Sequence, residues 1–266
     1  MLLQTKVDIR KAPFEISPAD RLLLVGSCFA DAVGSRLRDS RFRAEVNPYG
    51  VMYNPASILH TVERLSARGE RYDVAVLTLG TNHVYIEKET GEIVDNCQKR
   101  PQSLFEEREL AVAECAEYIR DAVSLLRKDG RRVRVVLTVS PIRYAKYGFH
   151  GSRLSKAVLL LAADEVVRTT GEVSVFEAYE IMNDELRDYR FYEPDMLHPS
   201  AQAVDYIYER FREAYFGKDA DSMYAEWQPI GRALAHRPFN PDGEEYREFL
   251  ENARRQEAAF MEKWKL

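Results

Sequence analysis

The stretch Leu22-Leu23-Leu24-Val25-Gly26-Ser27-Cys28-Phe29-Ala30 places a serine between an apolar run and a helix-compatible segment. The four apolar residues at 22–25 predict a buried strand, and the helical pattern begins near Ala30. Open α/β sheets bind ligands at the carboxyl ends of their parallel strands. The free N–H groups at the start of the following helix favour developing negative charge. We therefore predict Ser27 as the nucleophile of an acyl-transfer reaction.

A base for this serine is offered by Glu193-Pro194-Asp195-Met196-Leu197-His198-Pro199-Ser200, where an Asp stands three residues before a His. An imidazole accepts a serine proton only in the right tautomer and orientation, and a carboxylate on its other nitrogen provides both. Taken alone, the pattern is more often a helix start in which Asp195 or Ser200 caps the backbone. Combined with the strand-end serine, it favours His198 as the base and Asp195 as its orienting partner.

Two further polar turns follow predicted strands. Gly80-Thr81-Asn82-His83 comes after the apolar run 72–79, and Asn47-Pro48-Tyr49-Gly50 comes after the predicted strand 42–46. Glycine lets the backbone approach a substrate, and an asparagine side chain can donate to an oxyanion. Without other evidence, each segment would be only a turn.

Taken in order, these pieces resemble the SGNH (GDSL-like) hydrolases: an early serine, a glycine after the second strand, Gly-x-Asn after the third and a late Asp-x-x-His. The chain is still more similar to the GSCFA family, whose name stands here as Gly26-Ser27-Cys28-Phe29-Ala30. The likeness covers about residues 5 to 215. It continues in Asn47-Pro48-Tyr49-Gly50, Tyr53-Asn54-Pro55, Thr78-Leu79-Gly80-Thr81, Asn96-Cys97-Gln98-Lys99, Thr138-Val139-Ser140-Pro141-Ile142-Arg143, Leu154-Ser155-Lys156-Ala157, Asp188-Tyr189-Arg190-Phe191-Tyr192 and Asp195-Met196-Leu197-His198-Pro199.

The resemblance implies a serine acyl-hydrolase that forms an acyl-serine intermediate on a small polar or carbohydrate ester. Ser27 attacks, His198 removes its proton and Asp195 orients the imidazole. The oxyanion is held by the backbone N–H groups of Ser27 and Gly50 and by the Asn82 side chain. This chemistry needs no metal and no organic cofactor.

Two departures concern the loop that carries Ser27, which differs from the wider SGNH group, and the oxyanion site, which differs from the GSCFA relatives. Typical SGNH enzymes carry Gly-Asp-Ser, whereas Gly26 directly precedes Ser27 and no Asp stands beside it. Asn82 agrees with the wider group rather than with GSCFA relatives. An acyltransferase with the same triad and a non-catalytic binding protein that keeps the fold therefore remain open, although a pure binder has no physical need for the full set of polar groups.

The three cysteines, Cys28, Cys97 and Cys115, form neither a metal-binding spacing nor an even disulfide set. Cys28 is an alternative nucleophile, because a thiolate there gains from the helix N-terminus. The residue after a nucleophile in this geometry is expected to point inward, however, and a free cysteine packs well as a small apolar group. The five histidines show no i, i+4 pair, so we expect no metal site.

Substrate contacts are less well defined by the sequence. Arg143 follows the predicted strand 133–139, and its guanidinium can bind a carboxylate or a carbohydrate oxygen. A structural ion pair is an equal alternative. His83 either lines the pocket or covers its rim, and we favour the rim. Lys156 and Lys99 are weaker candidates, because most single lysines are solvated.

Apolar runs alternate with helical patterns along the chain, which predicts an α/β fold: a three-layer α/β/α sandwich with a mostly parallel five-stranded sheet. We assign residues 1–216 to this domain and 217–266 to a C-terminal helical extension, packed on the domain or at an oligomer contact, with a helix at 243–265. Residues 84–86 and 92–94 predict an inserted hairpin. The predicted strands are 22–25, 42–46, 73–79, 133–139 and 173–176, and the predicted helices are 30–39, 55–67, 105–129, 153–169 and 199–215.

Composition excludes several classes of protein. The chain has 266 residues, 45% hydrophobic and 30% charged, as is ordinary for a globular protein. A net charge of −5 disfavours nucleic acid as a partner. No apolar run approaches the length of a membrane span, and the N-terminus shows no signal-peptide pattern. We expect a cytoplasmic protein whose partner is its small-molecule or carbohydrate ester; a homodimer is possible, and the oligomeric state is open.

Overall fold

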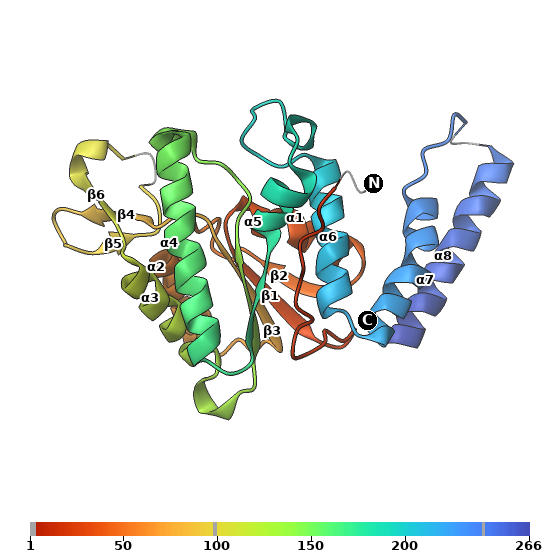
Figure 1. Ribbon diagram of the computed structural model, residues 1–266. Helices are drawn as coiled ribbons and strands as arrows, with labels where there is room; N and C mark the ends of the chain where they lie inside the picture. Colours follow the sequence, from red (N-terminus) through yellow and green to blue (C-terminus); the bar gives the residue numbers. More distant parts are fainter. Residues whose placement is uncertain (1–3, 98–99, 241–242) are drawn as a thin grey trace.

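A five-stranded parallel sheet forms the centre of the computed structural model, which describes residues 4–97, 100–240 and 243–266 (Figure 1). The strand order is β2-β1-β3-β7-β8, and every neighbouring pair is parallel. All five strands coincide with predicted strands to within a few residues. Their bounds are β1 Arg21–Gly26, β2 Arg43–Val46, β3 Val74–Leu79, β7 Arg134–Val139 and β8 Val173–Phe176.

Helices cover both faces of this sheet, and the side chains of β1 show why. Leu22 and Leu24 belong to one hydrophobic cluster, whereas Leu23 and Val25 belong to the other. A strand that is apolar on both faces has to be buried on both, so the predicted three-layer sandwich is confirmed. One face carries α2 Pro55–Ala67, α3 Val112–Leu126 and α4 Gly148–Thr169. The other face carries α1 Cys28–Asp39 and α6 Ala201–Tyr215 (Figure 1). The short α5 Ala178–Glu180 and a π-helical turn at Ile181–Leu186 precede α6.

A second, antiparallel sheet projects from the domain, in the order β5-β4-β6. The predicted hairpin is confirmed as β4 His83–Glu87 and β5 Ile93–Val94. The predicted helix 105–129 is wrong at its start, because Phe105–Glu109 forms β6 and pairs with β4. Only Phe105 of these five residues is buried, so backbone pairing with β4 outweighs a charged sequence that favours helix.

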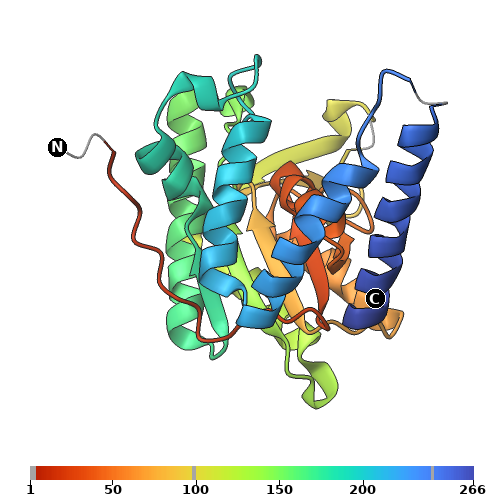
Figure 2. The ribbon, with the colours of Figure 1, turned by 90° about the vertical axis from the view of Figure 1, so that its right-hand side faces the viewer.

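The C-terminal region is a pair of long helices, α7 Lys218–Leu234 and α8 Glu244–Trp264, which lie side by side (Figure 2). The rings of Trp227 and Phe260 meet between them at 5.0 Å, and the Trp227 indole N–H donates to the Asp39 carbonyl at the end of α1. The predicted helix 243–265 is confirmed, whereas α7 was not predicted because Pro229 lies inside it. The division of the chain after residue 216 stays a prediction.

Within the described part of the chain, no helix combines the length and the apolar character needed to cross a bilayer.

Candidate active site

The turn from β1 into α1 is pressed against β3. Gly26 has φ +141°, and a Cβ there would lie 2.1 Å from the Thr78 carbonyl oxygen, so only glycine fits. The Ser27 N–H donates to that carbonyl at 3.1 Å, and the Gly26 N–H donates to the Asn47 side chain at 2.9 Å. These contacts fix the direction in which residues 27 and 28 leave the sheet.

Ser27 and Cys28 have different exposures on this turn. Ser27 is the N-cap of α1 and is fully buried. Its Oγ accepts from the Phe29 N–H at 3.3 Å and lies 3.3 Å from the Thr78 hydroxyl. Cys28 is the first residue of α1 and is partly exposed. The sequence predicted the opposite, with the residue after the serine packed inward.

Asp195 and His198 form the hydrogen-bonded pair that their spacing predicts. Asp195 Oδ2 lies 2.6 Å from His198 Nδ1, and Oδ1 accepts the backbone N–H groups of Leu197 at 2.8 Å and His198 at 3.0 Å. The two backbone N–H groups and the imidazole hold the pKa of Asp195 at about 2, so the carboxylate is ionised at neutral pH. With Nδ1 donating to the carboxylate, Nε2 presents the lone pair of a base. Among the described residues, no hydrogen bond joins His198 to Ser27.

Arg143 supports this turn from the end of β7. Its N–H donates to the Leu197 carbonyl at 3.1 Å, and its guanidinium lies 3.4 Å from the Met196 carbonyl. The guanidinium also stacks on the Tyr192 ring at 3.9 Å. The described residues provide no ion-pair partner for it, so the alternative of a structural ion pair is not what holds this side chain.

The three predicted oxyanion donors all have acceptors inside the protein. The Ser27 N–H is bonded to Thr78, the Gly50 N–H donates to the Asn47 carbonyl at 2.8 Å, and the Asn82 amide donates to the Leu110 carbonyl at 2.8 Å. The oxyanion role of Ser27, Gly50 and Asn82 stays a prediction. The backbone N–H groups of Ser27 and Gly50 would have to share or break these bonds, whereas the Asn82 amide has a second N–H that its bond to Leu110 does not use.

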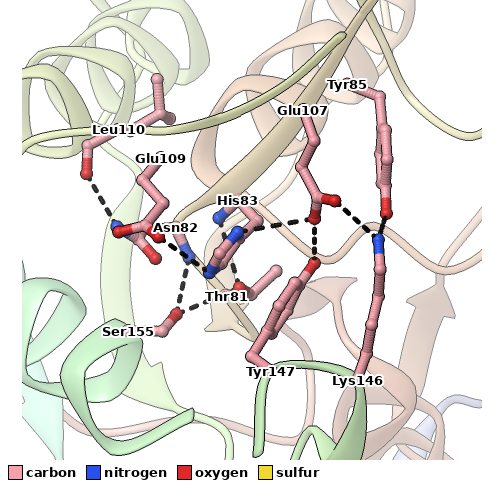
Figure 3. A network of polar contacts seen from close by, with 10 residues as sticks. All are labelled: Thr81, Asn82, His83, Tyr85, Glu107, Glu109, Leu110, Lys146, Tyr147 and Ser155. Carbon is pink, nitrogen blue, oxygen red and sulfur yellow. Dashed lines mark hydrogen bonds and ion pairs between the residues drawn. The ribbon is translucent and has the colours of Figure 1, made fainter. Parts of the chain in front are cut away.

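His83 is buried in a polar network between the antiparallel sheet and the loop that precedes α4 (Figure 3). Its ring stacks on Tyr147 at 3.6 Å, and Nδ1 lies 3.5 Å from Glu107 Oε1. The Tyr147 hydroxyl donates to the same carboxylate at 2.7 Å. Burial lowers the pKa of His83, although Glu109 and Glu107 act in the opposite direction. The contacts of His83 are therefore those of a buried structural residue rather than of an exposed rim.

Lys156 was a minor candidate in the sequence, yet it is buried beside the loop that leaves β3. Its Nζ donates to the Gly80 carbonyl at 2.6 Å, and the neighbouring Ser155 hydroxyl accepts the Asn82 N–H at 3.0 Å. Burial lowers the pKa of Lys156 to about 7. A single lysine in a helix gives no sign of burial, and the segment Leu154-Ser155-Lys156-Ala157 was the one signal that could have indicated a role.

Tyr144, which the sequence analysis did not single out, lies in the same place. Its hydroxyl is buried and has no hydrogen-bond partner among the described residues, and its ring lies 5.0 Å from Lys156 Nζ. A Cβ on Gly80 would come within 2.5 Å of this hydroxyl, so Gly80 is required for the close approach. Tyr144 follows directly after the segment 138–143 of the family likeness, which could have indicated it.

A cavity of about 480 Å³ opens beside these residues, with Lys156 at one side and Met196 of the Asp195–His198 turn at another. A second cavity of about 420 Å³ shares part of its wall. Arg143 lines both cavities, and its role in substrate binding stays a prediction. The other shared residues are Arg153, Tyr179, Asn183 and Tyr189.

The described residues include no group of three or more His, Cys, Asp or Glu that could hold a metal ion. Gln98 and Lys99, which belong to the family likeness, lie outside the described residues.

A family model of the GSCFA family matches residues 21–72 and 65–211. The chain belongs to the GSCFA family. A second model, described as the C-terminal domain of GSCFA domain proteins, matches residues 227–265 and so spans the end of α7 and all of α8 of this GSCFA protein. No protein with a curated description matches the chain.

Solved structures similar to this GSCFA protein include several proteins with hydrolase names. A member of the lipolytic G-D-S-L family from Veillonella parvula shares 11% identity over 73% of this chain and 97% of its own, with a TM-score of 0.49. A carbohydrate esterase of family 3 from Talaromyces cellulolyticus shares 11% identity over 72% and 93%, with a TM-score of 0.42. The structure of TesA shares 17% identity over 73% and 97%, with a TM-score of 0.44.

Proposed function

We propose that this GSCFA protein is an ester hydrolase that works through an acyl-enzyme intermediate at the carboxyl end of β1. The observation that carries the proposal is the 2.6 Å hydrogen bond between Asp195 and His198, which leaves the second imidazole nitrogen available as a base. The resemblance to the SGNH hydrolases supports the same assignment.

The reaction has two symmetrical halves. His198 Nε2 takes the proton of a nucleophile on the β1–α1 turn, where the sequence predicts Ser27, as the nucleophile attacks the ester carbonyl. The protonated imidazole then gives its proton to the departing alcohol, and Asp195 remains ionised throughout. Water, activated by the same imidazole, releases the acid and restores the nucleophile.

The substrate that suits the adjoining cavities is a small polar or carbohydrate ester. Arg143, Tyr179 and Tyr189 line both cavities. A guanidinium binds carboxylate or hydroxyl oxygens, and aromatic rings stack on the apolar faces of sugars. The alternative of an acyltransferase would use the same residues with an acceptor hydroxyl in place of water.

Turnover of p-nitrophenyl acetate by the His198→Ala variant tests the proposal. We expect kcat/KM to fall about 10²–10⁴-fold, the usual contribution of a general base, with the melting temperature unchanged because the side chain of His198 is exposed. His236→Ala, in the loop after α7, is the matched control and should keep wild-type turnover. Full activity in a folded His198→Ala variant would refute the assignment.

A further inference from the structure

The buried position of Ser27 opposes its use as a nucleophile. Its Oγ caps α1 through the Phe29 N–H and contacts the Thr78 hydroxyl, and the residue has no exposed surface. An attacking oxygen has to reach an ester carbonyl carbon, so Ser27 would have to give up both contacts. The cap of a helix and the nucleophile of a reaction are different tasks, and this side chain performs the first.

Cys28 is the adjacent side chain, and its surroundings are those of the proposed reaction. It is partly exposed at the first position of α1, where free N–H groups favour negative charge. Gly26 and Thr78 are partners in the register of β1 and β3, so Cys28 and Gly80 each follow two residues later at the same edge of the sheet, where the Gly80 carbonyl accepts from Lys156 Nζ. The thiol therefore shares one site with the groups that the proposed reaction uses.

A second observation, independent of the cysteine, indicates where an acyl oxygen can bind. The Tyr144 hydroxyl is buried and has no hydrogen-bond partner among the described residues. An unpaired buried hydroxyl is costly, and each one in a native protein calls for an explanation, of which a catalytic role is one and an ordered water another. A Cβ on Gly80 would come within 2.5 Å of this hydroxyl, and Gly80 follows β3 at the edge where Cys28 follows β1. To reach an acyl oxygen the Tyr144 hydroxyl has to turn, but unlike Ser27 it gives up no hydrogen bond to another described residue.

We propose that Cys28, rather than Ser27, carries the acyl group as a thioester, with the Tyr144 hydroxyl donating to the acyl carbonyl oxygen. The proposal rests on the proposed ester hydrolysis and names its nucleophile.

The thioester step balances with the groups at hand. The Cys28 sulfur forms a bond to the carbonyl carbon while its proton passes to His198 Nε2. The carbon–oxygen bond to the alcohol breaks, and the alkoxide takes the proton from His198. Water then attacks the thioester, gives a proton to His198, and the thiolate leaves and is reprotonated as the free acid departs.

The thiol needs this base, because it is not ionised at rest. Burial raises the pKa of Cys28, and the charges of Asp31 and Asp195 raise it further, while its own backbone N–H and Lys156 act in the opposite direction. A neutral thiol becomes a competent nucleophile when a neighbouring imidazole accepts its proton during attack. Activity should therefore depend on His198 as strongly as it would for a serine.

Acyl-enzyme trapping with p-nitrophenyl acetate decides between the two side chains. Wild type, Cys28→Ala, Cys28→Ser and Ser27→Gly are each mixed with the ester, quenched in acid, and examined by intact mass and peptide mapping. Gly is chosen at position 27 because it is a tolerated N-cap. Circular dichroism and the melting temperature establish that each variant is folded.

The expected result is an acetyl group on Cys28 in the wild type and in Ser27→Gly, and its loss, with turnover reduced at least about 100-fold, in Cys28→Ala. The wild-type adduct should be released by neutral hydroxylamine, as thioesters are. Any adduct on Cys28→Ser should resist it, because an oxygen ester is less reactive. This chemical difference identifies the attacking atom even where a variant is partly destabilised.

Two other outcomes have distinct meanings. An adduct mapped to Ser27, kept in Cys28→Ala and lost in folded Ser27→Gly, would overturn the cysteine assignment and leave the proposed hydrolase intact. No adduct and no turnover in the folded wild-type protein with acetyl and longer acyl esters would instead overturn the proposed function itself.

Discussion

Replacing Lys156 by methionine is expected to remove a pH dependence from the stability of the protein. The ammonium group of Lys156 is buried against the Gly80 carbonyl, and burial lowers its pKa from 10.5 to about 7. Between these two values the unfolded chain binds one proton more than the folded protein. The free energy of unfolding of the wild type should therefore rise with pH across this window.

The size of the effect follows from one proton. Each pH unit changes the free energy of unfolding of the wild type by about 1.4 kcal/mol. The difference in the free energy of unfolding between the wild type and Lys156→Met should therefore grow by about 2 kcal/mol in favour of the wild type between about pH 7.5 and about pH 9. The variant also leaves the Gly80 carbonyl without its donor, at a cost of about 1–3 kcal/mol that hardly changes with pH. The part of this free-energy difference that changes with pH therefore reports the burial of the charge, and the constant part reports the loss of the hydrogen bond.

Urea denaturation of the wild type and Lys156→Met at several pH values measures this difference. Lys128→Met, at an exposed lysine after α3, is the matched control and should show a constant offset from the wild type. A difference between wild type and Lys156→Met that stays flat from about pH 7.5 to about pH 9 would refute the reasoning, because Lys156 would then keep an ordinary pKa in the folded protein.

Three further outcomes are expected. Tyr144→Phe should leave the melting temperature unchanged, because the hydroxyl has no hydrogen-bond partner among the described residues to lose. It should lower kcat about tenfold or more with little change in KM. Tyr118→Phe on α3 is its control, and a loss of stability without a loss of kcat would contradict the oxygen-donor role. Burial lowers the pKa of His83, so the unfolded chain takes up this proton first as pH falls below 6.5. The free energy of unfolding of the wild type should therefore fall with pH in this range, and that of His83→Asn should not. Paired urea titrations measure the difference. Trp227→Ala should lower the free energy of unfolding by about 3–5 kcal/mol, since the ring packs against Phe260 and caps the end of α1, while turnover per folded molecule stays within about twofold.

The apolar strands were the most predictable part of the fold. Residues 74–79 are all buried between the two helical layers, and such a strand has to be apolar at nearly every position. This composition can be recognised in the sequence. Phe105–Glu109 was assigned to a helix because its charged residues favour one, and its pairing with β4 depends on a partner distant in sequence. Helix α7 was not predicted because Pro229 lies inside it and proline disfavours the interior of a helix. The packing of side chains such as Trp227 compensates for this cost.

The candidate site was predictable where its geometry is local. The spacing of Asp195 and His198 was enough to anticipate their hydrogen bond, because four residues of one turn supply it. The relative exposure of Ser27 and Cys28 depends instead on the contact between Gly26 and β3, which the sequence does not specify. Likewise, the burial of Lys156 arises from the packing of α4 on the loop after β3, a contact across 76 residues of chain.

The Asp195–His198 turn has a further consequence for how activity can vary. Among the described residues, the hydrogen bonds that orient the imidazole come from residues 195–198, whereas Arg143 ties the same turn to the end of β7. A displacement of the turn would change the reach of the base towards the β1–α1 turn without changing its tautomer. In the proposed reaction, the contacts that set the tautomer of the base therefore differ from those that set its distance from the β1–α1 turn.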